Sequence, residues 1–177
     1  MSLVQISGNA SGTGTLTIAA PNTNSNFTLT LPQTTATLNV NGPAFSAYAN
    51  ASQSIPITTY TKITFNAEEF DTASCFDSTT NYRFTPTVAG YYQVNLVISS
   101  SGNASHWALI YKNGSVFKYG APNYPALNIG FGASISVLVY MNGTTDYIEG
   151  YTYIAAAATI TNGTGSTYFQ ASMVRGA

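Results

Sequence analysis

The sequence predicts an all-β protein built as a sandwich or barrel of antiparallel sheets. Apolar and polar residues alternate along nearly every segment, which is the period of a strand with one buried face. Turn signals rich in Gly, Pro and Asn recur about every ten residues, and no window combines a helical period with helix caps. Many short strands at this spacing are typical of two packed sheets or a closed barrel.

The segment that ends at Gly42 predicts three short strands of its own. Apolar residues alternate with threonine and other polar residues over 16–20, 27–31 and 36–40, with the turns PNTNSN and PQT between them. A segment this short cannot enclose a core alone, so its apolar face needs another surface. Gly and Pro at 42–43 mark a boundary, which gives predicted domains at 1–42 and 43–177.

Beyond the boundary the predicted strands are longer and their faces can be assigned. They cover 60–66, 90–99, 106–120, 133–154 and 166–174, with hairpin turns of one kind at Asn113-Gly114 and, slightly longer, around Asn142-Gly143. The apolar residues that share a strand face, and that we expect in the core, are Tyr92, Val94, Leu96, Ile98, Ile135, Val137 and Val139.

The composition excludes two classes of partner. Charged residues make up only 6% of the chain and the net charge is −1, with no basic cluster to follow a phosphate backbone. No apolar run reaches the ~20 residues of a membrane helix, and the N-terminus lacks the basic and apolar regions of a signal peptide. We therefore expect neither nucleic acid binding nor membrane insertion.

The reactive side chains are too few and too scattered to predict an enzyme. His106 is the only histidine, and neither a catalytic triad nor a zinc site is available around it. Cys75 is the only cysteine, so no internal disulfide can form. Asp146 and Glu149 are three residues apart along a strand, which sends them to opposite faces and argues against a glycosidase pair.

One acidic stretch offers a weak candidate for a metal site, although we expect no cofactor. Glu68, Glu69 and Asp71 lie close together in the sequence, with Asp77 a few residues on. Clustered carboxylates can bind calcium, but the regular spacing of a calcium loop is missing. The alternative for these four residues is an ordinary solvated loop.

Residues 43–177 resemble the C1q-like globular domain, a relative of the tumour-necrosis-factor jelly roll. The FTPTVAGYY stretch at 84–92 is the most specific piece, and the last strand departs from the family pattern at Ala171, where a glycine is usual. The matching stretches, in family order, are PAFSAYAN (43–50), KITFNAEEFDT (62–72), NYRFTPTVAGYYQVNLVI (81–98), YKNGS (111–115), TTDYIEGYTY (144–153) and STYFQASMV (166–174).

The N-terminal segment is similar to a short repeat of bacteriophage tail-fibre and virion surface proteins, carried by GTGTLTIAAPNTNSNFTLTLPQTTATL at 12–38. The C1q-like resemblance implies a homotrimer around a three-fold axis. Three copies of the N-terminal segment would then bury their apolar faces against each other or on a partner. The residues we expect at this docking and trimerisation contact are Leu16, Ile18, Phe27, Leu29, Leu31, Leu38 and Val40.

Tyrosines supply two further candidate sites. Tyr147, Tyr151 and Tyr153 share one strand face, where they would contact the other subunits along the three-fold axis or, alternatively, stack against sugars. The longest irregular stretch, 119–131, is a candidate ligand or host contact through Tyr119, Asn123, Tyr124 and Asn128, with a plain surface loop as the alternative.

The resemblances predict a non-enzymatic trimeric protein on the surface of a phage virion. We expect a capsid decoration or cement protein that docks through its N-terminal segment on capsid or other virion proteins. One alternative is a tail-fibre tip or receptor-binding module that contacts host surface glycans or proteins. Another is a free C1q-like lectin or cytokine-type ligand.

Overall fold

The structure is a computed structural model of the 177-residue chain, and it describes residues 11–13, 24, 42–101, 105–122 and 132–177. The chain divides into two units, Met1–Ala36 and Thr37–Ala177, and every strand described below belongs to the second. The seven apolar residues predicted for the N-terminal contact lie outside the described residues. That contact and the boundary at residues 42–43 both stay predictions.

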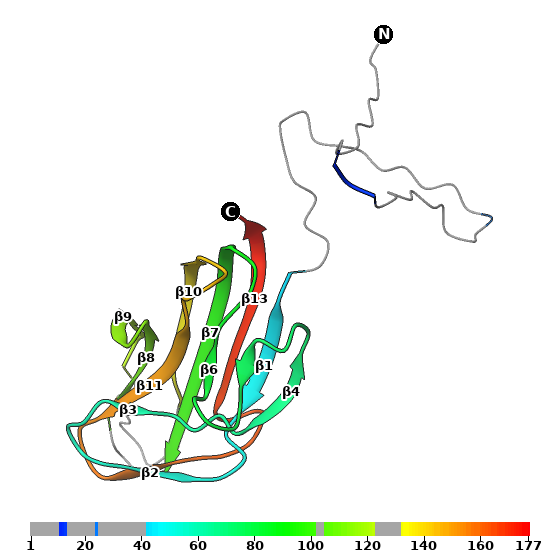
Figure 1. Cartoon of the computed structure of the whole chain (residues 1–177). Coiled ribbons are helices and arrows are strands. Elements are labelled where there is room, and N and C mark those ends of the chain that lie inside the picture. Colours follow the sequence, from blue (N-terminus) through cyan, green and yellow to red (C-terminus); the bar gives the residue numbers. More distant parts are fainter. Residues whose placement is uncertain (1–10, 14–23, 25–41, 102–104, 123–131) are drawn as a thin grey trace. The chain divides into compact units, whose positions relative to one another are not determined.

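Every regular element in the described ranges is a β-strand, so the predicted all-β class is confirmed (Figure 1). One sheet holds β2 (Gln53–Ile55), β12 (Ala158–Ile160), β7 (Gly90–Ser101), β13 (Tyr168–Gly176), β1 (Ala44–Tyr48) and β4 (Ala67–Asp71) in that order, and β10 (Gly132–Met141) also pairs with β7. The other holds β5 (Phe76–Asp77), β6 (Arg83–Phe84), β11 (Ile148–Ile154), β8 (His106–Lys112) and β9 (Ser115–Tyr119), and β3 (Thr61–Lys62) also pairs with β11.

The order of the strands is that of two antiparallel sheets connected by crossovers. The last strand, β13, lies between β7 and the first strand, β1, so both ends of the domain meet in the first sheet (Figure 1). All strand pairs are antiparallel, and β7 pairs along its length with β10. No helix in the described part of the chain is long and apolar enough to cross a membrane.

Alternation along the strands places the core as predicted. On β7, Tyr92, Val94, Leu96 and Ile98 are fully buried, while the residues between them face outward. On β10, Ile135 and Val139 are buried and Val137 packs against the core. These side chains fill the space between the sheets because a strand sends alternate residues to opposite faces.

Phenylalanines join the two sheets at the centre of this core. The ring of Phe45 on β1 stacks on Phe76 and on Phe84, with centroids 4.6 Å apart in both pairs. Phe169 on β13 meets Phe45 edge-on at 5.1 Å. Because Phe45 and Phe169 come from the first sheet and Phe76 and Phe84 from the second, this cluster holds the sheets face to face.

The two predicted hairpin turns differ in chemistry. Asn113 and Gly114 both have positive φ angles, 53° and 79°, as a type I′ turn requires. At the second turn only Gly143 has a positive φ, 71°, and the Oδ1 atom of Asn142 instead accepts hydrogen bonds from three following backbone N–H groups. The prediction of two turns of one kind is therefore wrong, because a side-chain cap shapes the longer loop.

The predicted strand at 60–66 is largely replaced by a side-chain bridge. Only Thr61–Lys62 forms a strand, β3, next to β11, and Ile63 N adds one hydrogen bond to Gly150 O at 3.0 Å. The amide of Gln53 takes over further backbone groups, since its Nε2 donates to Lys62 O at 2.9 Å and its Oε1 accepts from Thr64 N at 3.0 Å. Ile63 and Phe65 are nevertheless fully buried. The predicted alternation of buried and exposed residues is therefore confirmed, but the predicted strand pairing over the whole segment is not.

Candidate functional site

An aromatic surface covers the outward face of the second sheet. The register of β11 and β8 sets Tyr153 opposite Trp107 and Tyr151 opposite Leu109. On its other side, β8 pairs with β9 so that Leu109 faces Tyr119. Residues directly opposite each other in an antiparallel pair have side chains close enough to touch. Aromatic groups from three strands therefore meet on one face.

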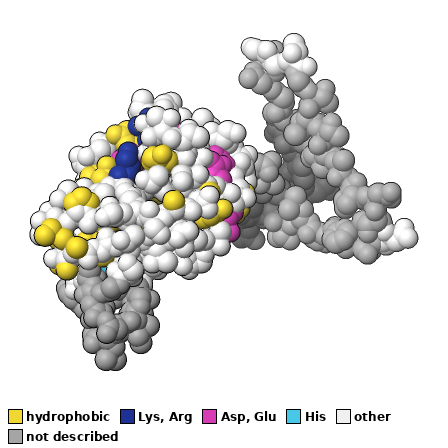
Figure 2. Space-filling view, turned by 90° about the horizontal axis from the view of Figure 1, so that it is seen from below, with side chains coloured by type: hydrophobic (Ala, Val, Ile, Leu, Met, Phe, Trp, Pro, Cys, Tyr) yellow, Lys and Arg dark blue, Asp and Glu magenta, His cyan; other side chains and the backbone are white. Residues whose placement is uncertain are grey.

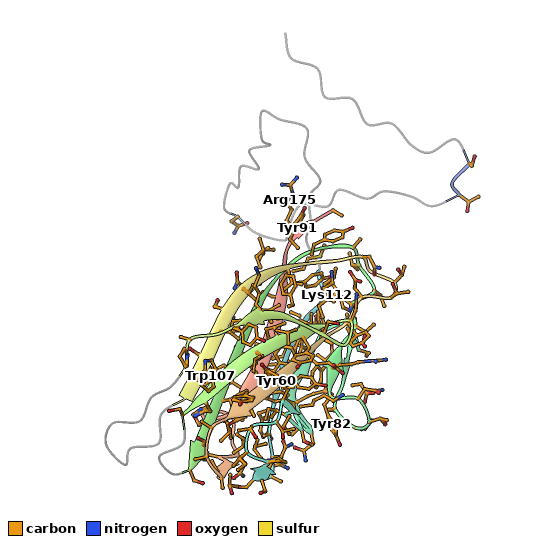
Figure 3. All side chains as sticks on the ribbon, turned by 90° about the vertical axis from the view of Figure 1, so that its left-hand side faces the viewer. Tyr60, Tyr82, Tyr91, Trp107, Lys112 and Arg175 are labelled. Atoms are coloured by element: carbon orange, nitrogen blue, oxygen red, sulfur yellow. The ribbon has the colours of Figure 1, made fainter. Side chains whose placement is uncertain are left out.

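Three of these groups, together with Tyr60 from the loop before β3, form what we call the aromatic pocket. Its lining residues, Tyr60, Trp107, Tyr119 and Tyr153, surround a cavity of about 280 Å³. The ring centroid of Tyr153 lies 5.1 Å from that of Tyr60 and 5.6 Å from that of Trp107. The hydroxyls of Tyr60 and Tyr119 are hydrogen-bonded at 3.3 Å. Tyr60 is 46% and Tyr119 60% exposed, and Tyr60 lies beside Trp107 on the face toward the viewer in Figure 3.

The neighbouring tyrosines extend the aromatic surface along β11. Tyr151 stacks on Tyr111 with centroids 3.8 Å apart, and the guanidinium of Arg83 lies 4.4 Å from the centre of the Tyr147 ring. The structure thus gives Tyr147, Tyr151 and Tyr153 partners within the chain. Their predicted contact with other subunits stays a prediction.

The tyrosine hydroxyls in and beside the pocket are neutral at physiological pH. The hydrogen bond to Tyr119 raises the pKa of Tyr60, and burial raises the pKa values of Tyr111 and Tyr151, so these phenols stay protonated at neutral pH. Lys62, which pairs with Tyr151 on the same face, forms an ion pair with Glu149 at 2.9 Å. None of the four lining residues carries a charge.

The predicted acidic cluster is used inside the domain. Asp77 accepts hydrogen bonds from the backbone N–H of Thr80, from the side-chain amide of Asn81 and from the backbone N–H of Thr79, which hold its pKa well below the usual range. Asp71 accepts from Ala73 N and Phe76 N, and Glu69 accepts from the Ser46 hydroxyl at 2.6 Å. Glu68 is exposed. Within the described ranges no three His, Cys, Asp or Glu residues gather as a metal site would require.

The other reactive residues also have structural partners. Asp146 pairs with Lys112 at 2.8 Å, whereas Glu149 pairs with Lys62, so the two carboxylates belong to separate ion pairs. His106 is buried, with Nδ1 3.3 Å from Ser100 Oγ and Nε2 2.9 Å from Ile98 O. Cys75 is a buried free thiol.

Sequence reasoning found only half of the aromatic pocket. Tyr119 and Tyr153 were each predicted as site residues, but for different sites, and Tyr60 and Trp107 were missed. The other loop candidates, Asn123, Tyr124 and Asn128, lie outside the described residues. The sequence did hold a signal for the pocket, because Trp107 and Tyr153 occupy outward-facing positions of their predicted strands. The sequence does not give the register that sets these two residues opposite each other.

A second exposed group, the apolar patch, lies on the first sheet and consists of Tyr91, Leu138 and Tyr140. These residues face outward on β7 and β10, and the rings of Tyr91 and Tyr140 are 5.4 Å apart. Their exposed fractions are 39%, 52% and 44%. In Figure 3, Tyr91 lies near the upper end of the domain, well above Trp107 and Tyr60.

Two cations lie beside this patch, because Lys112 Nζ is 5.8 Å from the centre of the Tyr140 ring and Arg175 on β13 pairs with Tyr91. The neighbouring part of the first sheet's outer face carries amide and hydroxyl side chains. Gln93 Nε2 donates to Ser136 Oγ at 2.9 Å, and Ser136 Oγ donates to Asn95 Oδ1 at 2.8 Å. The space-filling view from below likewise shows few charged side chains and a gathering of hydrophobic ones at one side of the domain (Figure 2). The described surface therefore has little charge to direct or repel a partner.

Comparison with known proteins identifies the fold. No family model matches the sequence, and no curated protein matches it. Among solved structures, the globular domain of zebrafish complement 1qA protein is similar with a TM-score of 0.59 and 16% identity, over 77% of this chain and 100% of that chain. Eiger TNF from S. frugiperda gives 0.58 and 10% over 77% and 94%, and the PRD1 vertex protein P5 gives 0.57 and 17% over 75% and 97%. The domain is thus a jelly roll of the C1q- and TNF-like kind, as predicted.

Proposed function

We propose that this chain is a non-enzymatic, trimeric structural protein of a virion surface, and specifically a capsid decoration or cement protein that docks through residues 1–42. The observation that carries the proposal is a jelly roll with few charged residues that leaves a group of large apolar side chains exposed on one sheet. Support for the virion comes from the structural likeness to PRD1 vertex protein P5, whose name places it at the vertex of a particle.

The apolar patch supports self-association. Strand residues with about half of their apolar surface in water gain free energy when a second copy covers them, at ~25 cal/mol per Å². Tyr91, Leu138 and Tyr140 meet this condition, whereas Tyr147, Tyr151 and Tyr153 are less exposed. We place the patch at the interface around the three-fold axis and keep the tyrosine row as the alternative.

Gold-antibody labelling of purified particles under the electron microscope tests the location. Label spread over the shell is the result we expect for a decoration protein. Label confined to the tail would move the protein to a fibre, and particles without label would contradict the virion proposal.

A deletion tests the docking role. Removing residues 1–42 leaves the strands and core of the second unit intact, so we expect a folded trimer that no longer sediments with particles. The full chain, added to the same particles, is the control. Sedimentation of the truncated trimer with particles would show that docking does not use the N-terminal segment.

A receptor-binding module is the second candidate, and the aromatic pocket favours it. A hollow lined by tyrosine and tryptophan is an unusual feature for a protein that only covers a shell, because exposed aromatic groups commonly mark binding sites. Binding of the isolated protein to host cells through the aromatic pocket would favour this candidate over the first.

A further inference from the structure

We propose that the aromatic pocket binds a neutral hexopyranose ring, either as a free sugar or as a residue of a polysaccharide. This inference goes beyond the proposed virion role and does not depend on it. It rests on the four described aromatic side chains that line the pocket, on the hydroxyls that three of them carry and on the lack of charge on all four.

The shape of the pocket suits a single ring. Its volume of about 280 Å³ lies just below the range of ~300–1,000 Å³ usual for small-molecule sites. The lining rings are inclined to one another, with interplanar angles of 46° between Tyr60 and Tyr153 and 66° between Trp107 and Tyr153. Inclined rings form walls, so a flat ligand can lie against one face while its edge meets the next.

The chemistry of the lining matches both sides of a sugar. A pyranose ring has apolar C–H faces, which stack on aromatic rings, and an equator of hydroxyl groups, which need hydrogen-bond partners. Tyr60 and Tyr119 present hydroxyls that are already 3.3 Å apart, so a ligand hydroxyl can join an existing hydrogen bond. Because the pKa of Tyr60 is raised by that bond, its phenol stays protonated at neutral pH.

Charge decides between a sugar and a cation. An aromatic cage also attracts quaternary ammonium groups through the ring faces. Here none of the four described lining residues is acidic, and Glu149, four residues before Tyr153 in the sequence, is already ion-paired with Lys62 at 2.9 Å. A neutral ligand with many hydroxyls therefore fits better than a quaternary ammonium ion.

The pocket carries its own reporter. Trp107 is the only tryptophan in the chain, so tryptophan emission from the full-length protein reports on this site alone. The probes are the methyl glycosides of glucose, galactose, mannose and N-acetylglucosamine, each titrated to about 100 mM because one stacked ring gives dissociation constants in about the millimolar range. We expect a saturable emission change with at least one of them.

Variants in and outside the pocket show whether the change arises there. Tyr119→Ala removes a ring that is 60% exposed, so it should leave the fold intact and weaken the binding of the responding glycoside about tenfold. Tyr119→Phe keeps the ring and should weaken glycoside binding less than Tyr119→Ala does. The matched control is Phe70→Ala on β4, an aromatic residue that is 51% exposed and lies outside both the pocket and the patch, and it should leave glycoside binding unchanged.

Other outcomes would overturn the proposal. No emission change with any of the four glycosides, or an equal change in Tyr119→Ala, would exclude a hexose site here. A response to tetramethylammonium chloride that sodium chloride does not reproduce, without a response to glycosides, would assign the pocket to cations instead. A fall in the mass of the assembly caused by Tyr119→Ala would place the pocket in a subunit interface.

Dextran, a neutral polymer of glucose, distinguishes the two sources of the ring. If methyl glucoside binds, tighter binding of dextran per glucose residue would indicate a polysaccharide ligand, since a multivalent protein gains avidity on a repeating chain. Equal binding per residue would indicate a free sugar. Neither result bears on the virion proposal, which the gold-labelling experiment tests. Either proposal can therefore be contradicted without the other.

Discussion

The aromatic pocket and the apolar patch are built from the same kinds of residue but differ in shape and surroundings. In the pocket, rings from three strands and a loop enclose a cavity, and two of their hydroxyls are hydrogen-bonded. In the patch, Tyr91, Leu138 and Tyr140 stand on two neighbouring strands beside amide and hydroxyl side chains. A hollow with hydroxyls suits a small polar ligand, whereas exposed residues on a strand surface suit another protein surface.

Both regions depend on one core, and Phe45→Ala should damage them together. Phe45 is 1% exposed and contacts three other phenylalanine rings between the sheets. Its truncation leaves a cavity, so we expect a loss of about 3–5 kcal/mol in the free energy of unfolding, measured with denaturant. Phe70→Ala is the matched control, since Phe70 is 51% exposed and its loss should change stability by less than about 0.5 kcal/mol. Equal losses in the two variants would contradict the central role of the phenylalanine cluster.

Loss of the Lys62–Glu149 ion pair on the second sheet should cost less stability than Phe45→Ala. Lys62→Met leaves Glu149, whose side chain is 6% exposed, without its ion-pair partner, and we expect a loss of about 2 kcal/mol because Lys62 itself is partly exposed. Adding Glu149→Gln should restore much of the loss, since no charge then remains buried. Denaturant unfolding of the two variants and the wild type measures the difference. A double variant that is less stable than Lys62→Met would show that the pair contributes little.

Acid should weaken the end of the domain that holds the patch. Burial raises the pKa of Asp146, but hydrogen bonds from Lys112, Asn113 and Asn142 outweigh it and lower the pKa below the usual value. Lys112 also donates to Tyr140 O, which joins this ion pair to the patch.

A group with a lowered pKa stabilises the fold above its unfolded pKa of about 4, and this contribution is lost as the pH falls through the folded value. Asp146→Asn should therefore cost about 1 kcal/mol at pH 7, and the difference from wild type should shrink toward pH 2. Denaturant unfolding across this pH range measures it. A difference that stays constant with pH would show that the carboxylate charge is not the cause.

The smallest effect on stability, with the largest on assembly, is expected from the patch itself. Leu138→Ser replaces a residue that is 52% exposed, so the free energy of unfolding of the single chain should change by less than about 0.5 kcal/mol. Sedimentation should nevertheless show dissociation at concentrations at which the wild-type chain stays assembled. Tyr153→Phe, in the tyrosine row, is the comparison. If that variant dissociates and Leu138→Ser does not, the interface belongs to the second sheet.

The strands were readable from the sequence because alternation is local. The buried faces of β7 and β10 follow directly from their residue pattern, and Asn113-Gly114 marks its turn by itself. The pocket was not readable, because Tyr60 and Trp107 reach Tyr153 only through the register of β3 and β8 on β11. Which strands pair, and in which register, depends on the packing of the whole sandwich.

Side chains that replace backbone pairing were also hidden in the sequence. The side chain of Gln53 takes the place of a strand partner near Lys62. The side chain of Asn142 caps its loop, although the Asn142-Gly143 pair predicted the same kind of turn as Asn113-Gly114. The same holds for Asp71 and Asp77, whose hydrogen bonds to nearby backbone amides give an acidic stretch a structural role. Polar residues of this kind show their use only when the backbone around them is known.

The mass of the full-length protein in solution, measured by light scattering, tests the central claim most directly. We predict about three times the chain mass of 18.6 kDa for the wild type, and a lower mass for Leu138→Ser at the same concentration. A wild-type mass of a single chain would contradict the trimer, and a trimer unaffected by Leu138→Ser would contradict the assignment of the apolar patch to its interface.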